Sequence, residues 1–174
     1  LNNHELKQQL HRLQEDCLAQ QKDYYSEICL WYQPWLNSLS NILEQGVVLL
    51  IDYGFPRREY YLPERRQGTL KCHFRHRSHD DPLIYPGIQD ITAHVDFTRV
   101  AQSAYNANFE IKGFTTQAHF LLDCGLTELI PTKANAADEM GHHNAIKQLT
   151  LPTEMGELFK VMALTRNVEV PLLG

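Results

Sequence analysis

One segment limits the possible folds of this chain more than any other, a run of apolar residues, VVLLI, at 47–51. It follows a helical pattern that Gly46 is placed to end, and it leads directly into Asp52, Tyr53 and Gly54. A strand that is apolar on both faces is what a parallel sheet covered by helices needs. The order of helix, glycine, buried strand and acidic turn therefore predicts an α/β fold.

Further helices and strands are expected on both sides of that run. Residues 4–22 carry a thin apolar stripe, so we expect residues 1–25 to be a helical lead-in. A second helix over 26–43 should kink or restart at Pro34. Beyond the run, we expect helices at 95–109 and 117–124 (closed by Gly125) and a helix or turn at 152–159. We also expect strands at 109–114 and 160–164, with 168–170 as a candidate strand partner.

Two segments show no clear periodicity. Residues 131–144 are polar and are expected to be a connection. Residues 55–92 carry four of the eight prolines together with many charges and histidines. A loop of this length in a compact domain is usually functional or disordered, so we expect 55–92 to be a long loop beside the active site.

Size and charge narrow the possible partners. A chain of 174 residues is about one domain, which gives residues 1–174 as a single domain. The net charge of −5 argues against a nucleic-acid partner, because such a surface needs clustered Lys and Arg. The arginines between Arg57 and Arg77 are expected to be a solvated basic run. No apolar run reaches about 18 residues, so no membrane span is expected.

Three groups of polar residues are candidates for chemistry, and the first is Asp52-Tyr53-Gly54. Ligands of open α/β sheets bind at the carboxyl ends of strands, where an Asp and a Tyr can hold a cation or a hydrogen-bonding substrate. Glycine lets the backbone turn sharply there. The alternative is a plain turn between a strand and a loop.

The second group is Cys72-His73-x-x-His76-x-x-His79. A thiol and imidazoles at this spacing are possible zinc ligands. The distant second pair of ligands that zinc sites usually have is missing, and nothing fixes a contact with His142 and His143. We therefore predict no metal site, and interpret these histidines as polar groups of the active site or of loop packing.

The third group lies in GIQDITAHVDF at 87–97, where Asp90, His94 and Asp96 precede a predicted helix. Either Thr92 or Asp90 is expected to cap that helix, and Asp96 is explained equally well as a favourable charge in its first turn. The two acids and the histidine still make this segment the best local candidate for a substrate pocket. No Gly-rich loop of the GxGxxG type occurs anywhere in the chain.

Five blocks, taken in order, resemble a known family. They are GVVLLIDYGFPRREYY, GTLKCHFRHRSHDDP, PGIQDITAHVDFT, TTQAHFLLDCG and PTEMGELFKVMALTR. Together they resemble the MidA-type family of SAM-dependent methyltransferases, whose eukaryotic relatives are mitochondrial complex I assembly factors. The resemblance runs from about Glu27 to Arg166, and the style of the blocks favours a bacterial, cytoplasmic protein.

The resemblance implies the C-terminal part of a class I, Rossmann-like methyltransferase with helices on both faces of its sheet. Residues 47–51 would be the fifth strand, and 109–117 and 159–170 would supply the last two. The SAM-binding residues of the family match no position here, so the cofactor-binding residues are unknown and SAM is expected only in the intact protein. This makes residues 1–174 a partial domain, which we expect to be inactive alone.

Family members are linked to arginine methylation of a respiratory-chain subunit, so the resemblance implies a protein substrate, possibly a complex I-type subunit. The expected catalytic residues are Asp52, Asp90, His94 and Asp96, and the expected substrate-binding residues are Tyr53, Gly54, His76, Thr92 and Gln117. The alternative is a non-catalytic module that binds a protein through the same polar surface. Without a neighbouring fourth strand, 47–51 would have an unpaired edge, so a homo-oligomer is expected unless residues 4–22 cover that edge.

Overall fold

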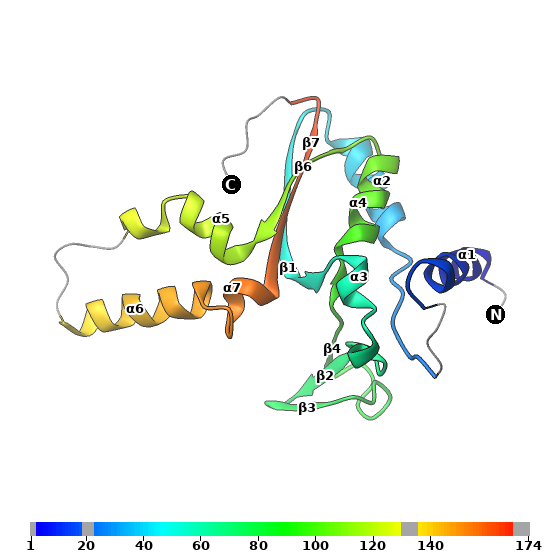
Figure 1. Cartoon of the computed structure of the whole chain (residues 1–174), viewed down its shortest axis with the longest axis horizontal. Helices are drawn as coiled ribbons and strands as arrows, with labels where there is room; N and C mark the ends of the chain where they lie inside the picture. Colours follow the sequence, from blue (N-terminus) through cyan, green and yellow to red (C-terminus); the bar gives the residue numbers. More distant parts are fainter. Residues whose placement is uncertain (1–2, 19–22, 130–135, 169–174) are drawn as a thin grey trace. The chain divides into compact units, whose positions relative to one another are not determined.

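The chain forms two compact units in the computed structural model, which describes residues 3–18, 23–129 and 136–168 (Figure 1). Unit 1 consists of Leu1–Tyr32 and Phe55–Val100, and unit 2 of Gln33–Gly54 and Ala101–Gly174. Within the described ranges, no helix is both long enough and apolar enough to cross a membrane.

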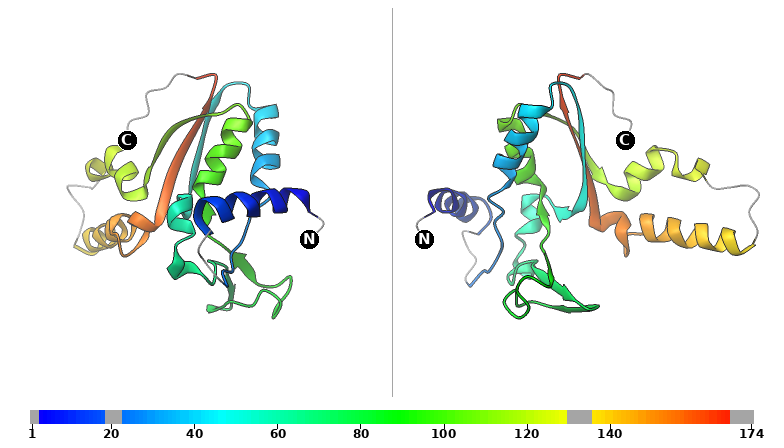
Figure 2. Two further views of the ribbon diagram at one scale, coloured as in Figure 1. Left: turned by 45° about the vertical axis from the view of Figure 1, so that its right-hand side comes forward. Right: turned by 180° about the vertical axis from the view of Figure 1, so that it is seen from behind.

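Unit 2 is built on strands β1 (Gly46–Phe55), β7 (Phe159–Arg166) and β6 (Glu110–Thr116). β7 lies between the other two and runs antiparallel to both, with Ile51 opposite Val161 and Phe114 opposite Met162. The three strands lie side by side in every view (Figures 1 and 2). The strands expected at 47–51, 109–114 and 160–164 are therefore confirmed, and β1 and β6 are parallel to each other.

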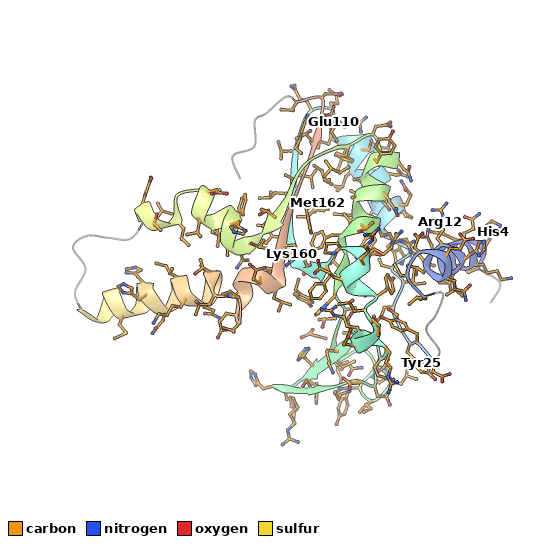
Figure 3. All side chains as sticks on the ribbon, viewed as in Figure 1. His4, Arg12, Tyr25, Glu110, Lys160 and Met162 are labelled. Atoms are coloured by element: carbon orange, nitrogen blue, oxygen red, sulfur yellow. The ribbon has the colours of Figure 1, made fainter. Side chains whose placement is uncertain are left out.

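The expectation that 47–51 is apolar and buried on both faces is wrong for the described residues. Val47, Leu49 and Ile51 are 44%, 44% and 48% exposed and share one face of the sheet. The strand that is buried on both faces is β7, on which Lys160 and Met162 are labelled in Figure 3. Successive residues of β7 are buried, so both of its faces are covered, whereas the face of β1 that carries Val47, Leu49 and Ile51 stays open to solvent.

Helix α2 (Tyr32–Ile42) packs in unit 2 against the second half of α4 (Phe97–Asn106). Gln33 Nε2 donates to the Ser103 carbonyl at 3.3 Å, and Asn106 Nδ2 donates to Gln33 Oε1 at 3.2 Å. A helix was expected from residue 26, but α2 begins only at Tyr32. Pro34 then falls in the first turn, where its missing N–H is tolerated.

The remaining helices of unit 2 are α5 (Gln117–Asp123), the 3₁₀ turn η3 (Leu126–Leu129), α6 (Ala136–Thr150) and α7 (Met155–Leu158). The expected end of α5 at Gly125 is confirmed, since Gly125 has a φ of 84°. The polar connection expected at 131–144 is wrong from residue 136 onward, because α6 is a helix whose polar sequence lacks an apolar stripe. Residues 130–135 and 169–174, including most of the candidate strand 168–170, lie outside the described residues.

Unit 1 begins with α1 (His4–Leu13), which continues into the π-helical turn η1 (Gln14–Leu18). Asn3 Oδ1 caps α1 by accepting from the Leu6 N–H at 3.1 Å. Leu13 is buried in a cluster with Tyr60 and Tyr61, so the lead-in packs on unit 1. Its helical character is confirmed for 4–18, and residues 19–22 lie outside the described part of the chain.

The absence of regular structure expected for 55–92 is wrong. This segment contains α3 (Arg57–Tyr60), the 3₁₀ turn η2 (Pro63–Arg65) and a small antiparallel sheet with the order β3-β2-β4. The strands are β2 (Lys71–Phe74), β3 (Arg77–His79) and β4 (Asp90–Thr92), followed by the short β5 (Val95–Asp96). Strands of three or four residues are too short to show the alternation by which a strand is recognised in sequence.

Candidate functional site

The carboxyl end of β1 presents Asp52, Tyr53 and Gly54 in unit 2. Asp52 is exposed, and its Oδ1 accepts from the Tyr53 N–H at 2.8 Å. The Tyr53 ring meets Phe159 edge-on, with 5.5 Å between centroids. Gly54 is buried. These residues are still part of β1, with Asp52 opposite Lys160, so the alternative of a plain turn after the strand is wrong and the strand end offers an exposed carboxylate beside a packed aromatic ring.

A cavity of about 210 Å³ lies in unit 1, and both His94 and Asp96 line it. The other polar or aromatic lining residues are Glu27, Tyr32, Tyr60, Tyr61 and Arg99. Burial raises the pKa of all three tyrosines, so their hydroxyl groups stay protonated and can donate hydrogen bonds. The cavity therefore has aromatic walls, neutral donors and two carboxylates.

Asp96 has a defined local task, since it caps α4. Its Oδ1 accepts from the Arg99 N–H at 3.0 Å, and its Oδ2 lies 3.7 Å from Arg57 Nε. Burial raises the pKa of Asp96, against the opposing effects of the Arg99 hydrogen bond and of Arg57. The expectation that Thr92 or Asp90 caps this helix is wrong, because both residues lie in β4 and the short strand β5 comes between them and α4.

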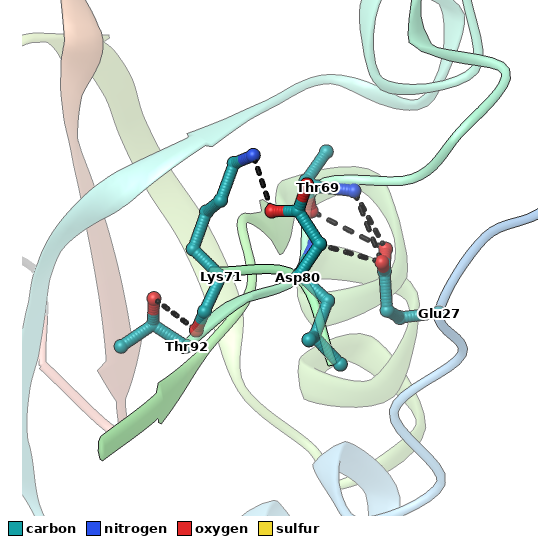
Figure 4. Close-up of polar contacts among 6 residues, drawn as sticks. Glu27, Thr69, Lys71, Asp80 and Thr92 are labelled. Carbon is teal, nitrogen blue, oxygen red and sulfur yellow. Dashed lines mark hydrogen bonds and ion pairs between the residues drawn. The ribbon is translucent and has the colours of Figure 1, made fainter. Parts of the chain in front are cut away.

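Glu27 is a central residue that the sequence analysis missed. Its carboxylate accepts from the backbone N–H groups of Thr69 (3.0 Å) and Leu70 (2.8 Å), from Thr69 Oγ1 (3.3 Å) and from the Tyr60 hydroxyl (3.3 Å), as Figure 4 shows for Thr69. A side chain at Gly68, whose φ is 78°, would collide with this carboxylate. The one signal in the sequence is the pair Gly68-Thr69, because a glycine at this position leaves room for the carboxylate of an acidic residue far away in the chain.

His94 is connected to Glu27 through Thr69. The His94 N–H donates to Thr69 Oγ1 at 3.0 Å, and Thr69 Oγ1 in turn donates to Glu27. The His94 ring packs against Phe55, with 5.2 Å between centroids. These contacts fix the position of His94 at the cavity that Asp96 also lines, and the use of this cavity as a substrate pocket stays a prediction.

The other predicted site residues of unit 1 lie on its small sheet. Asp90 is exposed in β4 opposite His73, and Thr92 Oγ1 donates to the Lys71 carbonyl at 3.4 Å (Figure 4). His76 is exposed at the tip of the β2–β3 hairpin, with a φ of 62°. Within the described residues, no group of three His, Cys, Asp or Glu side chains is arranged to hold a metal ion.

Gln117 is the remaining candidate, and it is buried. Its Nε2 donates to the Leu149 carbonyl at 3.0 Å, which joins α5 to α6 within unit 2. Of the predicted residues, Asp52, Tyr53, Gly54 and Gln117 belong to unit 2, and His76, Asp90, Thr92, His94 and Asp96 to unit 1. Their assembly into one shared site stays a prediction.

Comparison with known proteins places this geometry in a family. The model of the family described as "Putative S-adenosyl-L-methionine-dependent methyltransferase" matches residues 1–115. The chain is also 32% identical over 127 residues to the protein arginine methyltransferase NDUFAF7 homolog, mitochondrial, of Drosophila melanogaster. That match covers 71% of this chain and 27% of the fly protein.

Two crystal structures from Burkholderia thailandensis are similar in fold. One, an uncharacterized COG1565 superfamily protein, has a TM-score of 0.87 and 38% identity, covering 95% of this chain and 44% of its own. The other, a COG1565 superfamily member bound to S-adenosyl-homocysteine, has a TM-score of 0.85 and 37% identity, covering 99% of this chain and 44% of its own. The chain thus spans less than half the length of these relatives.

The family model covers well over half of the chain, and the resemblance to the MidA-type family is confirmed along with the α/β fold it implies. The chain therefore belongs to this family of S-adenosyl-L-methionine-dependent methyltransferases.

Proposed function

We propose that the chain is part of a SAM-dependent methyltransferase that modifies arginine in a protein substrate. The observation that carries the proposal is the similarity over 99% of the chain to a structure bound to S-adenosyl-homocysteine, which is what SAM becomes after donating its methyl group. The name of the fly relative, a protein arginine methyltransferase, supports arginine as the acceptor.

The residues of the unit 1 cavity do not fit the whole cofactor. Its volume of about 210 Å³ lies below the roughly 300–1,000 Å³ typical of ligand pockets. The chain also has no GxGxxG loop to hold the nucleotide. When bound to the intact protein, SAM supplies an activated methyl group. We propose that the residues of this chain bind and orient the arginine substrate, and we expect the chain alone to be inactive.

Arginine is a difficult acceptor, and this defines what the chain has to do. A guanidinium is always charged and delocalised, so it is a poor nucleophile until it is oriented. A carboxylate that accepts two of its N–H groups holds it in a plane and draws its positive charge to one side. Methyl transfer then depends on the positioning of the acceptor nitrogen.

The proposal assigns these tasks to named residues. Asp52 in unit 2 and Asp90 in unit 1 each have an exposed carboxylate, and each is proposed as a group that can hold a guanidinium. Asp96 acts as a positioning residue, because its oxygens are engaged with Arg99 and Arg57. His94 and Tyr53 orient the acceptor. The remaining substrate contacts are proposed for Gly54, His76, Thr92 and Gln117.

The proposal also covers the identity of the protein substrate and the cellular compartment. We infer a subunit of a complex I-type respiratory assembly as substrate, in the cytoplasm of a bacterium, because a mitochondrial relative and two Burkholderia structures are similar to this chain. The open face at Val47, Leu49 and Ile51 supports a homo-oligomer of residues 1–174.

Comparison of the intact gene product with its Asp90→Asn variant tests the proposal. The assay measures transfer of a labelled methyl group from SAM to an arginine-containing protein. Loss of a group that stabilises developing charge costs about 100-fold in rate, which is the loss expected for Asp90→Asn. Asp123→Asn, an exposed acid on α5, is the matched control and should keep full activity. An Asp90→Asn variant as active as the wild type would remove Asp90 from the reaction, and no methyl transfer by either protein would favour a non-catalytic binding surface.

A further inference from the structure

A second cavity in unit 1, of about 600 Å³, lies beside the β2–β3 hairpin and has no part in the proposed reaction. The polar and aromatic residues that line it are Phe74, Arg75, Arg77, Ser78, His79 and Tyr85. We propose that this pocket, named here the hairpin pocket, binds an acidic peptide segment of the protein substrate. The inference rests on the proposed function in taking the partner to be the substrate.

The turn of the hairpin has an unusual sequence for its conformation. Arg75 and His76 have φ values of 48° and 62°, so both central residues of the turn are left-handed. Such turns normally use Asn-Gly, because a side chain at positive φ is strained. Strained residues of this kind are concentrated at functional sites, and here the strain places an arginine at the mouth of a cavity.

The two arginines of the hairpin pocket are available to an incoming anion. Among the described residues, neither Arg75 nor Arg77 belongs to an ion pair. The nearby acids are otherwise engaged: Asp80 Oδ1 is 2.6 Å from Lys71 Nζ, and Asp81 Oδ1 accepts from the Leu83 N–H at 2.8 Å. Neither acid lines the cavity.

The His79 imidazole supports a ligand in this pocket independently of the arginines. Both of its ring nitrogens are buried, and neither has a hydrogen-bond partner among the described residues. Leaving a buried polar group unsatisfied is costly, so each such group in a native structure needs an explanation, which a bound ligand would supply here. The His79 ring is held edge-on to Tyr85, which itself stacks on Phe74 with 4.6 Å between centroids, so the imidazole is fixed in the pocket wall.

The surroundings favour a peptide over other anions. Ile84 lines the pocket and is 50% exposed, and Leu83 and Ile88 nearby are 79% and 65% exposed. An exposed apolar rim around two guanidinium groups fits a segment that alternates acidic and aliphatic side chains. A nucleic acid needs an extended cluster of Lys and Arg, whereas two arginines, Arg75 and Arg77, line this pocket.

The test is a titration of the ¹⁵N-labelled 174-residue chain, followed by NMR. The probes are the peptide acetyl-Glu-Leu-Glu-Ile-amide and its neutral counterpart acetyl-Gln-Leu-Gln-Ile-amide. The acidic peptide should shift the amides of 74–79 and the ring nitrogens of His79. Because hydrogen bonds between charged groups are the strong ones, the neutral peptide should bind about ten-fold more weakly or worse.

Arginine variants test whether the acidic peptide binds through the hairpin pocket. Arg75→Gln combined with Arg77→Gln should weaken the acidic peptide about ten-fold or more, and Arg77→Gln alone should weaken it measurably if the double variant does not fold. Arg58→Gln removes an exposed arginine of α3 in the same unit and should leave the affinity unchanged. Equal binding of the two peptides, shifts elsewhere, or tighter binding of oligothymidylate or inorganic phosphate at these residues would overturn the proposal. Methyl transfer is not measured here, so such a failure would leave the proposed function standing.

Discussion

Asp96 offers a sharp test of the structure, because its two contacts can be separated by two substitutions. Asn caps helices about as well as Asp, so Asp96→Asn keeps the bond to the Arg99 N–H and removes only the charge. Asp96→Ala removes the cap as well. Burial raises the pKa of Asp96, so ionising this carboxyl group costs more free energy in the folded chain than in the unfolded chain. A neutral isostere should therefore cost little, even though Arg57 lies 3.7 Å away.

The expected changes in the free energy of unfolding follow from the different contacts that the two substitutions remove. At pH 7, Asp96→Asn should change the free energy of unfolding by less than about 1 kcal/mol, and Asp96→Ala should be about 0.5–2 kcal/mol less stable than the Asn variant. Urea unfolding measures the first quantity, and hydrogen exchange of the α4 amides reports the cap locally. Asp16→Asn is the control: Asp16 also pairs with Arg57 but is 56% exposed, so its loss should cost under about 1 kcal/mol.

The dependence on pH has a defined sign. The folded chain holds the Asp96 proton more tightly than the unfolded chain, whose aspartate has the ordinary pKa of 3.8. The contribution of Asp96 to stability is therefore fully present below pH 3.8 and is lost as the pH rises through the raised folded pKa. Relative to Asp96→Asn, the wild type should lose stability over that range. A loss of about 3 kcal/mol or more in Asp96→Asn at pH 7, the cost of breaking a favourable buried pair, would refute this reasoning.

Three further predictions concern the loop at Glu27, the cofactor and the assembly. Gly68→Ala should lower the free energy of unfolding by more than about 1 kcal/mol, because the new methyl group collides with Glu27 and a side chain is strained at a φ of 78°. Gly125→Ala is the control, since it has only the strain of its φ of 84°. Equal losses of the two variants in urea unfolding would contradict this prediction. Isothermal titration should show no tight SAM binding by the 174-residue chain, and micromolar binding would show that it holds the cofactor by itself. Light scattering at several concentrations should show a homo-oligomer that Leu49→Lys weakens, since Leu49 is 44% exposed on the open sheet face; a monomer at every concentration would exclude it.

The sequence predicted the parts of the fold whose signals are local and long. The run at 47–51 became β1, the strands at 109–114 and 160–164 became β6 and β7, and Gly125 follows the end of α5. Each has either a continuous apolar stretch or a residue whose backbone preference is strong. How deeply each strand is buried could not be predicted from such local signals. Val47 and Met162 lie in equally apolar runs, but Val47 is 44% exposed and Met162 only 3%, because burial depends on what packs on each face of the sheet and not on the run itself.

The candidate site was less predictable, because its contacts join residues far apart in the chain. Glu27 accepts from Thr69 and Leu70, about forty residues further on, and nothing local distinguishes it from other acids. The helix cap was placed on Thr92 or Asp90 because β4 and β5 are too short to be recognised. The β2–β3 hairpin was missed because Arg75 and His76 occupy a turn that Asn-Gly normally signals.

The central claim is that this chain belongs to an enzyme that methylates arginine, and the identity of the methylated residue tests it most directly. The intact gene product is incubated with methyl-labelled SAM and a protein extract, and the labelled protein is hydrolysed and its amino acids are separated. The account predicts that the label elutes as methylarginine and that Asp90→Asn slows its appearance about 100-fold. Label on lysine, on a carboxyl group or on no protein at all would contradict the account.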